Sequence, residues 1–292
     1  MLYAANYGYA ASAALDPMEK KPLYHFYPGS TIFSLGAVGC NLKCGFCQNW
    51  QISQQEAPAF EIPPDEAIRL ARAYRSHGCV GLAYTYSEPF MWYEWVLDTC
   101  RLARREGLKN VLVTNGFINE DPLQELLPLV DAMNIDVKAF RPGFYRRVCK
   151  GKLEPVLATV ERAYKAGCHV EVTTLLIPGL NDSDEELEAL AGWLASLGED
   201  IPYHLSRYFP NYQFDLPPTP LATLERARRI ARKKLRYVYL GNAPAEDGNH
   251  TRCHQCGQEV ILRDGFGVKG YRLRGKCCDR CGAEIHLVGE PC

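Results

Sequence analysis

The 292-residue chain lacks the features of several protein classes. It contains no stretch of the roughly 20 consecutive apolar residues that a membrane span requires. It has no basic excess, because 33 lysines and arginines face 34 acidic residues and the net charge is −1, which argues against a DNA-binding or membrane-surface protein. Its first residues show neither the basic nor the continuous apolar region of a signal peptide. We therefore expect a cytoplasmic protein with no DNA or membrane partner.

Cysteine, by contrast, is abundant, with 13 residues that are unevenly spread. A chain of this length buries enough apolar surface to fold without disulfides, so metal binding or redox chemistry is the expected use of these thiols. One cluster contains Cys40, Cys44 and Cys47. A second contains Cys253, Cys256, Cys277, Cys278 and Cys281. The isolated cysteines are expected to be ordinary packing or surface residues: Cys79, Cys100, Cys149, Cys168 and Cys292.

Apolar segments rich in β-branched residues alternate with segments of helical periodicity. Strands are predicted at residues 31–38, 80–86, 110–114, 132–137, 170–177, 202–208 and 237–240. Helices are predicted at residues 63–76, 88–106, 121–127, 154–166, 183–196 and 221–234. Asp121 is the expected N-cap of one helix, and Ser183 with Glu186 forms an expected capping box on another.

Strict alternation of strand and helix implies parallel strands joined by right-handed crossovers. We predict an α/β fold built as a TIM-like (β/α) barrel, partial or complete. A doubly wound open sheet is the alternative, although no GxGxxG motif follows the first strand. Small, acidic and proline residues mark a linker near residue 245. The predicted domains are therefore a barrel at 1–245, with 1–30 as its lead-in, and a small cysteine module at 246–292.

The first cysteine cluster directly follows the first predicted strand, with the spacing C-x3-C-x2-C. Three thiolates hold three irons of a 4Fe–4S cluster and leave the fourth iron without a protein ligand. An open position distinguishes a metal centre that binds substrate from a structural one, and the amino and carboxylate groups of S-adenosylmethionine (SAM) can chelate such an iron. A structural zinc site with a remote fourth ligand is the alternative.

This motif, with the aromatic Phe46 before its last cysteine, resembles the radical SAM superfamily. Nearly the whole chain resembles the AmmeMemoRadiSam-system radical SAM enzymes, which are relatives of the pyruvate formate-lyase activating enzymes. The segments that carry this resemblance are 16–30, 39–54, 84–89, 136–138, 179–182, 203–210 and 241–242, together with the C-terminal cysteine pairs.

The resemblance implies an enzyme that receives an electron from a low-potential donor and cleaves SAM reductively to a 5′-deoxyadenosyl radical. That radical then takes a hydrogen atom from a protein or peptide substrate, and an AMMECR-like or Memo-like protein is an expected partner. Two alternatives are a radical SAM enzyme that acts on a small molecule and a metal-stabilised binding scaffold with a non-catalytic barrel.

Polar residues lie on or after further predicted strands. Because active sites of such barrels gather at the carboxyl ends of the strands, these side chains are expected to converge. In the superfamily, the segment after the second strand contacts the SAM amino group, which here is Thr85–Pro89. The residues expected to hold SAM are Phe46, Ser87, Glu88, Asn115, Asp136, Lys138 and His204.

The C-terminal cysteines form two CxxCG pairs about 21 residues apart, which is typical of a zinc ribbon. The expected ligands of the structural Zn²⁺ are Cys253, Cys256, Cys278 and Cys281. The glycine after each pair permits a tight turn toward sulfur. Cys277, His254 and His286 are alternative ligands, and an auxiliary iron–sulfur cluster is the alternative occupant.

Overall fold

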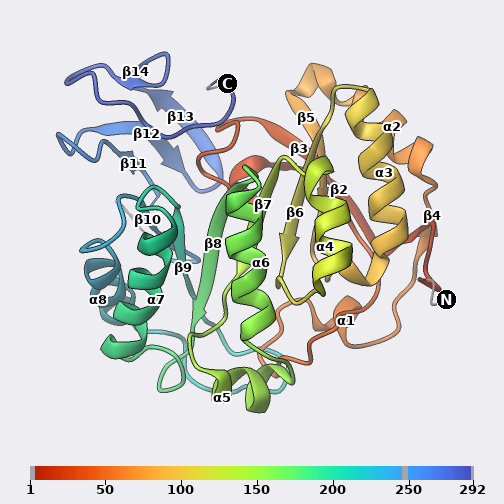
Figure 1. Ribbon diagram of the computed structural model, residues 1–292, viewed down its shortest axis with the longest axis horizontal. Coiled ribbons are helices and arrows are strands. Elements are labelled where there is room, and N and C mark those ends of the chain that lie inside the picture. Colours follow the sequence, from red (N-terminus) through yellow and green to blue (C-terminus); the bar gives the residue numbers. More distant parts are fainter. Residues whose placement is uncertain (1–3, 245–248, 291–292) are drawn as a thin grey trace.

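The computed structural model describes residues 4–244 and 249–290 (Figure 1). An eight-stranded sheet has the order β10-β9-β8-β7-β6-β5-β3-β2. All neighbouring strands are parallel except β2 (Ser12–Pro17), which is antiparallel to β3. The parallel strands are β3 (Thr31–Gly36), β5 (Cys79–Tyr84), β6 (Lys109–Thr114), β7 (Ala132–Asp136), β8 (His169–Leu176), β9 (Tyr203–Arg207) and β10 (Val238–Gly241). The predicted parallel α/β architecture is confirmed.

Helices follow most of these strands, as the periodicity predicts. The longer helices are α2 (Pro64–Ala73), α3 (Tyr93–Arg105), α4 (Glu120–Leu126), α6 (Glu154–Lys165), α7 (Asp184–Leu197) and α8 (Leu221–Ala231). Short helices are α1 (Trp50–Ser53) and α5 (Pro142–Phe144), and 3-10 or π turns occupy Met18–Lys20, Arg75–His77, Pro89–Trp92, Leu127–Leu129 and Tyr145–Cys149.

Three details of the predicted helices are wrong. The segment predicted as one helix at 88–106 begins with a 3-10 turn, because Glu88 caps that turn by accepting a hydrogen bond from Phe90 N (3.2 Å). Asp121 lies inside α4, whose N-cap position is Asn119. Ser183 Oγ does accept from Glu186 N (3.4 Å), but the Glu186 carboxylate binds Phe140 N instead of completing the capping box.

Across residues 4–244 and 249–290 the sheet does not close into a barrel, so the complete barrel is not formed. β2 and β10 are the two edges of the sheet order. The doubly wound alternative also fails, because successive parallel strands always add on the same side and the order never reverses. Right-handed crossovers that all advance in one direction place their helices on one face, and α4 and α6 lie in front of the strands in Figure 1.

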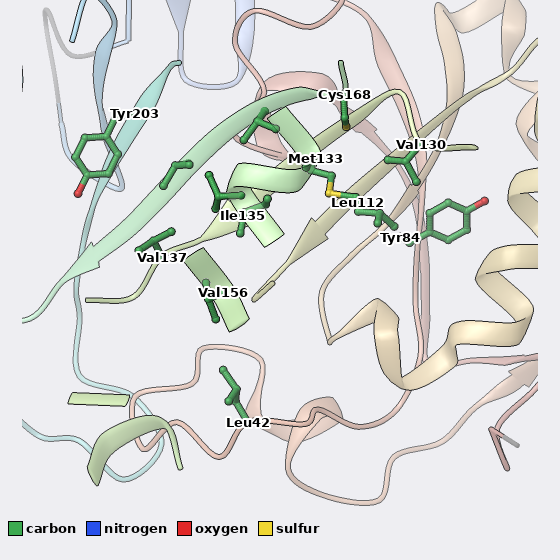
Figure 2. Close-up of a cluster of buried hydrophobic side chains, with 14 of the residues drawn as sticks. Leu42, Tyr84, Leu112, Val130, Met133, Ile135, Val137, Val156, Cys168 and Tyr203 are labelled. Carbon is green, nitrogen blue, oxygen red and sulfur yellow. The ribbon is translucent and has the colours of Figure 1, made fainter. Parts of the chain in front are cut away.

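The two faces of the sheet differ in chemistry, as alternation along β7 shows. Met133, Ile135 and the following Val137 belong to the apolar core that also contains Val156 of α6 (Figure 2). Asn134 and Asp136 line a cavity on the opposite face. Helices therefore cover the apolar face and leave the polar face for other segments.

The predicted lead-in at 1–30 contributes an eighth strand and a cover for this polar face. β2 pairs along the whole of β3, and β1 (Tyr9–Ala10) pairs with β4 (Phe60–Glu61). Met18, Leu23 and Phe26 pack in a second apolar cluster with Ala83, Val111 and Ala132 of the sheet. The segment after β2 therefore crosses the sheet at its polar face.

The C-terminal strands lie at the opposite end of the sheet from α1 (Figure 1). They are β11 (Thr251–Arg252), β12 (Glu259–Asp264), β13 (Gly267–Tyr271), β14 (Leu273–Arg274) and β15 (Cys277–Cys278). Tyr27 N donates to Val288 O and Val288 N donates to His25 O, both at 2.8 Å, so this module holds the N-terminal segment. The domain boundary predicted near residue 245 lies outside the described residues, as does Cys292.

Within residues 4–244 and 249–290, no helix combines the length and apolar character required to cross a membrane.

Candidate active site and metal centre

The first cysteine cluster lies on the loop between β3 and α1. Its members are Cys40, Cys44 and Cys47. Lys43 N donates to Cys149 O and Gln213 N donates to Gly45 O, both at 2.9 Å. These backbone bonds tie the loop to the segments after α5 and after β9. All three thiols line one cavity.

The sulfur atoms of this loop face hydrogen-bond donors. Cys40 Sγ accepts from Leu42 N (3.4 Å) and Asn115 Nδ2 (3.5 Å), and Cys47 Sγ is 3.1 Å from Ser53 Oγ. Such contacts stabilise thiolate ligands.

Protonation of these thiols depends on their surroundings. Burial and the Glu88 carboxylate raise the pKa of Cys40 to about 12. A hydrogen bond with the Cys149 thiol, followed by burial, raises the pKa of Cys44 well above its ordinary value. Metal binding must therefore displace a proton from Cys40 and from Cys44. Cys149, predicted to be ordinary packing, is buried as expected but lies beside a candidate ligand.

Glu88 is the central acceptor at the carboxyl end of the sheet. Its carboxylate accepts from Thr114 Oγ1 (2.7 Å), Asn115 N (2.8 Å) and Phe90 N (3.2 Å). Burial raises its pKa to about 7, although these hydrogen bonds act in the opposite direction. Glu88 therefore joins the ends of β5 and β6 and offers a carboxylate to a cationic group.

The remaining predicted residues also line this cavity. Lys138 Nζ pairs with Asp136 Oδ2 at 2.8 Å, as expected for neighbours on one face of a strand. Ser87 Oγ donates to Ala37 O (2.5 Å). Phe46 packs on Phe214 with ring centroids 5.8 Å apart. The loop after β9 thus covers the cysteine loop through an aromatic contact.

The cavity has a volume of about 580 Å³ and extends along the polar face of the sheet. At the carboxyl ends of the strands, the cavity is lined by the three cysteines and the polar strand ends. Its floor is formed by the N-terminal segment and by the tip of the β12–β13 hairpin. The floor residues that sequence reasoning did not select are Glu19, Lys20, Lys21, Pro22, Tyr24 and Phe266.

His204 lines the cavity but does not lie at a strand end. It is the second residue of β9, because the strand begins directly after Pro202. Its Nε2 lies 2.6 Å from Glu171 Oε2, and Glu171 Oε1 also accepts from His25 N (2.7 Å) and contacts His169 Nε2 (3.0 Å). His204 is therefore fixed near the floor by a fully buried carboxylate that the sequence analysis missed.

The C-terminal cysteines form a separate site. The sulfur atoms of Cys253, Cys256, Cys278 and Cys281 all lie within 4.8 Å of one another. Cys253 Sγ is 3.5 Å from Cys281 Sγ, and Cys256 Sγ is 3.7 Å from Cys278 Sγ. Cys277, His254 and His286 are not in this group.

Both C-terminal pairs use the same turn. Gly257 and Gly282 follow the pairs with φ of +74° and +76°, where only glycine is unstrained. Gly257 N donates to Cys253 O and Gly282 N donates to Cys278 O, both at 2.9 Å. The two knuckles therefore have matching backbone conformations, and they direct four thiols to one point.

Comparison with known proteins identifies the family. The model of the Radical SAM superfamily matches residues 35–194, which is more than half of the chain. The chain belongs to the radical SAM superfamily. The matched region contains all three cysteines of the first cluster and the strand ends of β5, β6 and β7.

Similar sequences support this assignment. The chain is 45% identical over 296 residues to "Uncharacterized protein MJ0808" of Methanocaldococcus jannaschii, covering 99% of this chain and 87% of that protein. It is 24% identical over 209 residues to pyruvate formate-lyase 1-activating enzyme of Escherichia coli K12, covering 66% of this chain and 85% of that enzyme.

Solved structures share the fold. Streptococcus suis SuiB bound to S-adenosylmethionine aligns with a TM-score of 0.60 and 14% identity, over 78% of this chain and 53% of that one. A radical SAM methyltransferase from Sphaerobacter thermophilus aligns with a TM-score of 0.57 and 19% identity, over 75% of this chain and 68% of that one.

Membership of the superfamily implies SAM and a 4Fe–4S cluster as cofactors and supports an enzyme. The residues present fit such a cluster, since three thiols lie on one loop and one of them, Cys40, accepts from two N–H donors. A buried carboxylate and a Lys–Asp pair lie in the same cavity. The cavity of this radical SAM chain therefore offers candidate ligands and polar groups of the kinds that these cofactors bind.

Proposed function

We propose that the chain is a radical SAM enzyme in which Cys40, Cys44 and Cys47 hold the 4Fe–4S cluster. When bound and reduced, the cluster would supply the electron that cleaves SAM to methionine and a 5′-deoxyadenosyl radical. Transfer of a hydrogen atom from the substrate to that radical would give 5′-deoxyadenosine. The observation that supports this best is that the three thiols and the polar strand ends line one cavity.

The chain's own residues orient SAM in this proposal. Glu88 and Ser87 accept from the SAM ammonium, and Lys138 binds its carboxylate as a cation. Asp136 and Asn115 face the remaining polar groups, and Phe46 offers an apolar ring. Glu171 fixes His204 deeper in the cavity than the other predicted residues. In this proposal, His204 contacts the part of SAM that extends toward the floor.

A protein or peptide substrate is proposed from the similarity to pyruvate formate-lyase activating enzymes. An AMMECR-like or Memo-like protein is the proposed partner, together with a low-potential electron donor. A small-molecule substrate is the second candidate, because the N-terminal segment and Phe266 line the polar face together with the strand ends and bound a cavity of about 580 Å³.

We propose that the C-terminal site holds structural Zn²⁺. A tetrahedral zinc with Zn–S distances of about 2.3 Å places its sulfur ligands about 3.8 Å apart. The sulfur separations of 3.5 and 3.7 Å match that spacing. An auxiliary iron–sulfur cluster would separate the thiols further. Zinc here supports a module too small to fold well without metal.

The test is anaerobic reconstitution with iron and sulfide, metal analysis, and then addition of dithionite and SAM. About four irons and one zinc per chain, with 5′-deoxyadenosine formed, support the proposal. About eight irons would assign the C-terminal site to a second cluster. If the chain neither takes up iron nor cleaves SAM, the non-catalytic scaffold is the remaining explanation.

A further inference from the structure

A group of charged residues lies on the floor of the cavity, away from the cysteine loop. Asp16 accepts from Lys20 Nζ (2.8 Å), Lys21 Nζ (2.6 Å) and Tyr86 OH. Asp16 is 4% and Lys21 is 1% exposed, so this ion pair is shielded from bulk water, whereas the Lys20 side chain is 44% exposed. Lys20, Lys21 and Tyr86 all line the cavity.

The charges of this group do not balance. Two ammonium groups share the single carboxylate of Asp16. The neighbouring acid Glu19 cannot make up the difference, because it pairs with Arg263 (Oε1 to Nε, 3.2 Å). An excess positive charge therefore remains at the cavity floor.

Hydrogen-bond donors are also in excess. Each ammonium carries three N–H donors, and each directs one of them at Asp16. Lys21 Nζ lies 4.3 Å from the centroid of the Tyr86 ring, a cation–π contact in which no oxygen atom accepts from the ammonium group. A buried cation with unused donors binds anionic oxygen well, because few water molecules compete for it.

Tyr86 connects this group to the proposed SAM site. Its φ of +68° is in the left-handed region, which is strained for a residue with a side chain. This conformation lets the ring reach back from the end of β5 to Asp16 on β2. The next two residues, Ser87 and Glu88, line the cavity at the carboxyl ends of the strands. A ligand bound at the lysines thus lies beside SAM.

We propose that Lys20, Lys21 and Tyr86 form an anion subsite that holds a carboxylate or phosphate group of the substrate, with Asp16 positioning both ammonium groups. This inference rests on the proposed function, since it names the substrate chemistry of the same cavity. The anionic group belongs either to a small molecule or to an acidic side chain of a peptide.

The experiment uses the reconstituted enzyme with SAM and measures binding of inorganic phosphate by calorimetry. Lys21→Met is expected to weaken phosphate binding at least about tenfold, because the buried cation is lost. Lys21→Arg keeps the charge and is expected to retain binding within about threefold. The control Lys165→Met removes an exposed lysine paired with Glu161 and leaves phosphate binding unchanged.

A double variant covers the case in which Lys21→Met does not fold. Asp16→Asn with Lys21→Met removes one charge of each sign from the buried pair, so folding is preserved. It is expected to bind phosphate as weakly as the single variant. Wild-type affinity in a folded variant that lacks Lys21 would overturn the subsite.

Competition against phosphate separates the two sources of the anion. Small dicarboxylic and phosphorylated acids form one arm, and a short glutamate peptide with its glutamine counterpart forms the other. Displacement by the small acids or by the glutamate peptide, but not by the glutamine peptide, supports the subsite and identifies the source. Displacement by no acid overturns it.

Failure of the subsite and failure of the proposed function have different signatures. If the wild-type enzyme cleaves SAM but phosphate binding does not depend on Lys21, the subsite alone is overturned. Lys21-dependent phosphate binding in a chain that takes up iron but does not cleave SAM overturns the proposed function and, with it, the assignment of this anion site to a radical substrate.

Discussion

At the scale of single residues, Cys44 carries the sharpest prediction. Its thiol is 7% exposed and belongs to the only loop in the described chain that presents three cysteines to the cavity. Cys44→Ala is expected to abolish cluster assembly and SAM cleavage, because two thiolates cannot retain the iron. Iron content, the absorbance of the cluster and 5′-deoxyadenosine are measured.

A second buried cysteine provides the control. Cys168 is also 7% exposed, but it packs in the apolar core shown in Figure 2. Cys168→Ala is expected to retain full iron content and SAM cleavage while lowering stability by about 1 kcal/mol. SAM cleavage by Cys44→Ala at the level of this control would refute the role of the loop.

The buried ammonium group of Lys21 predicts that anion affinity depends on pH. Burial lowers its pKa to about 8, although Asp16 acts in the opposite direction. The ammonium is charged below that pH and loses its proton as the pH rises through it. Asp16 and Tyr86 face Lys21, but their pKa values are displaced below and above this range. Anion affinity is therefore expected to fall about tenfold between pH 7 and pH 9.

Sulfate is the appropriate probe for this measurement, because its charge does not change in that range. Lys21→Arg remains charged at pH 9 and is expected to bind sulfate equally at both values. The same fall in the arginine variant would show that another group controls the affinity.

At the scale of elements, the absence of a side chain at Gly81 permits the close approach of β5 and β6. A Cβ at this position would lie 2.0 Å from Lys109 O and 2.5 Å from Lys109 N, which is closer than any real contact. Gly81→Ala is expected to destabilise the chain by about 3 kcal/mol, because the backbones of paired strands must separate. Chemical denaturation measures the change.

Gly192 is the matched control for this substitution. It lies inside α7, and an added Cβ meets no atom within 4 Å. Gly192→Ala is expected to stabilise the chain by about 0.5–1 kcal/mol, because alanine loses less backbone entropy in a helix. Equal effects of the two substitutions would contradict this account of the sheet.

Glu171 joins β8 to β9 and to the N-terminal segment. Burial alone would raise its pKa, but hydrogen bonds from His169 and His204 outweigh burial and lower it. A depressed carboxyl pKa contributes stability above the unfolded value of about 4.3, and that stability is lost as the pH falls below it. Glu171→Gln is expected to cost about 3 kcal/mol at pH 7 and to lessen the acid sensitivity.

Unfolding of both chains is compared from pH 3 to pH 7. Glu161→Gln removes an exposed carboxylate paired with Lys165 and is expected to change stability by no more than about 0.5 kcal/mol. An acid transition of Glu171→Gln identical to that of the wild type would show that other carboxylates dominate it.

At the scale of the whole molecule, the C-terminal module supports the cavity floor. Arg263 of β12 is buried, pairs with Glu19 and donates to Tyr24 O (2.7 Å). Tyr271 OH donates to Pro28 O (2.9 Å). The four-cysteine site and the floor of the cavity are thus connected through one N-terminal segment, although the cysteine loop lies at the other end of the sheet.

Cys256→Ser tests this arrangement. It is expected to lower the zinc content and the unfolding temperature before it changes the iron content, because the two metal sites are separate. Metal analysis and thermal unfolding are measured on the same preparation. Loss of iron with zinc unchanged would show that the C-terminal site is an auxiliary cluster.

The sequence by itself determined the parallel α/β fold and the family. Local information is sufficient for both, because strand and helix periods are set by neighbours in the chain and C-x3-C-x2-C is a short motif. The CxxCG pairs are equally local, which is why the sequence selected Cys278 over Cys277, as the geometry also does.

Only the tertiary structure decided the open barrel, the pairing of β2 with β3 and the cavity floor. These depend on contacts between distant segments, such as Glu171 with His204 or Asp16 with Tyr86. Asp16 and Lys21 are near neighbours in the sequence, but nothing local shows that their charges are buried. The excess of positive charge became visible only when the fold enclosed it beside the strand ends.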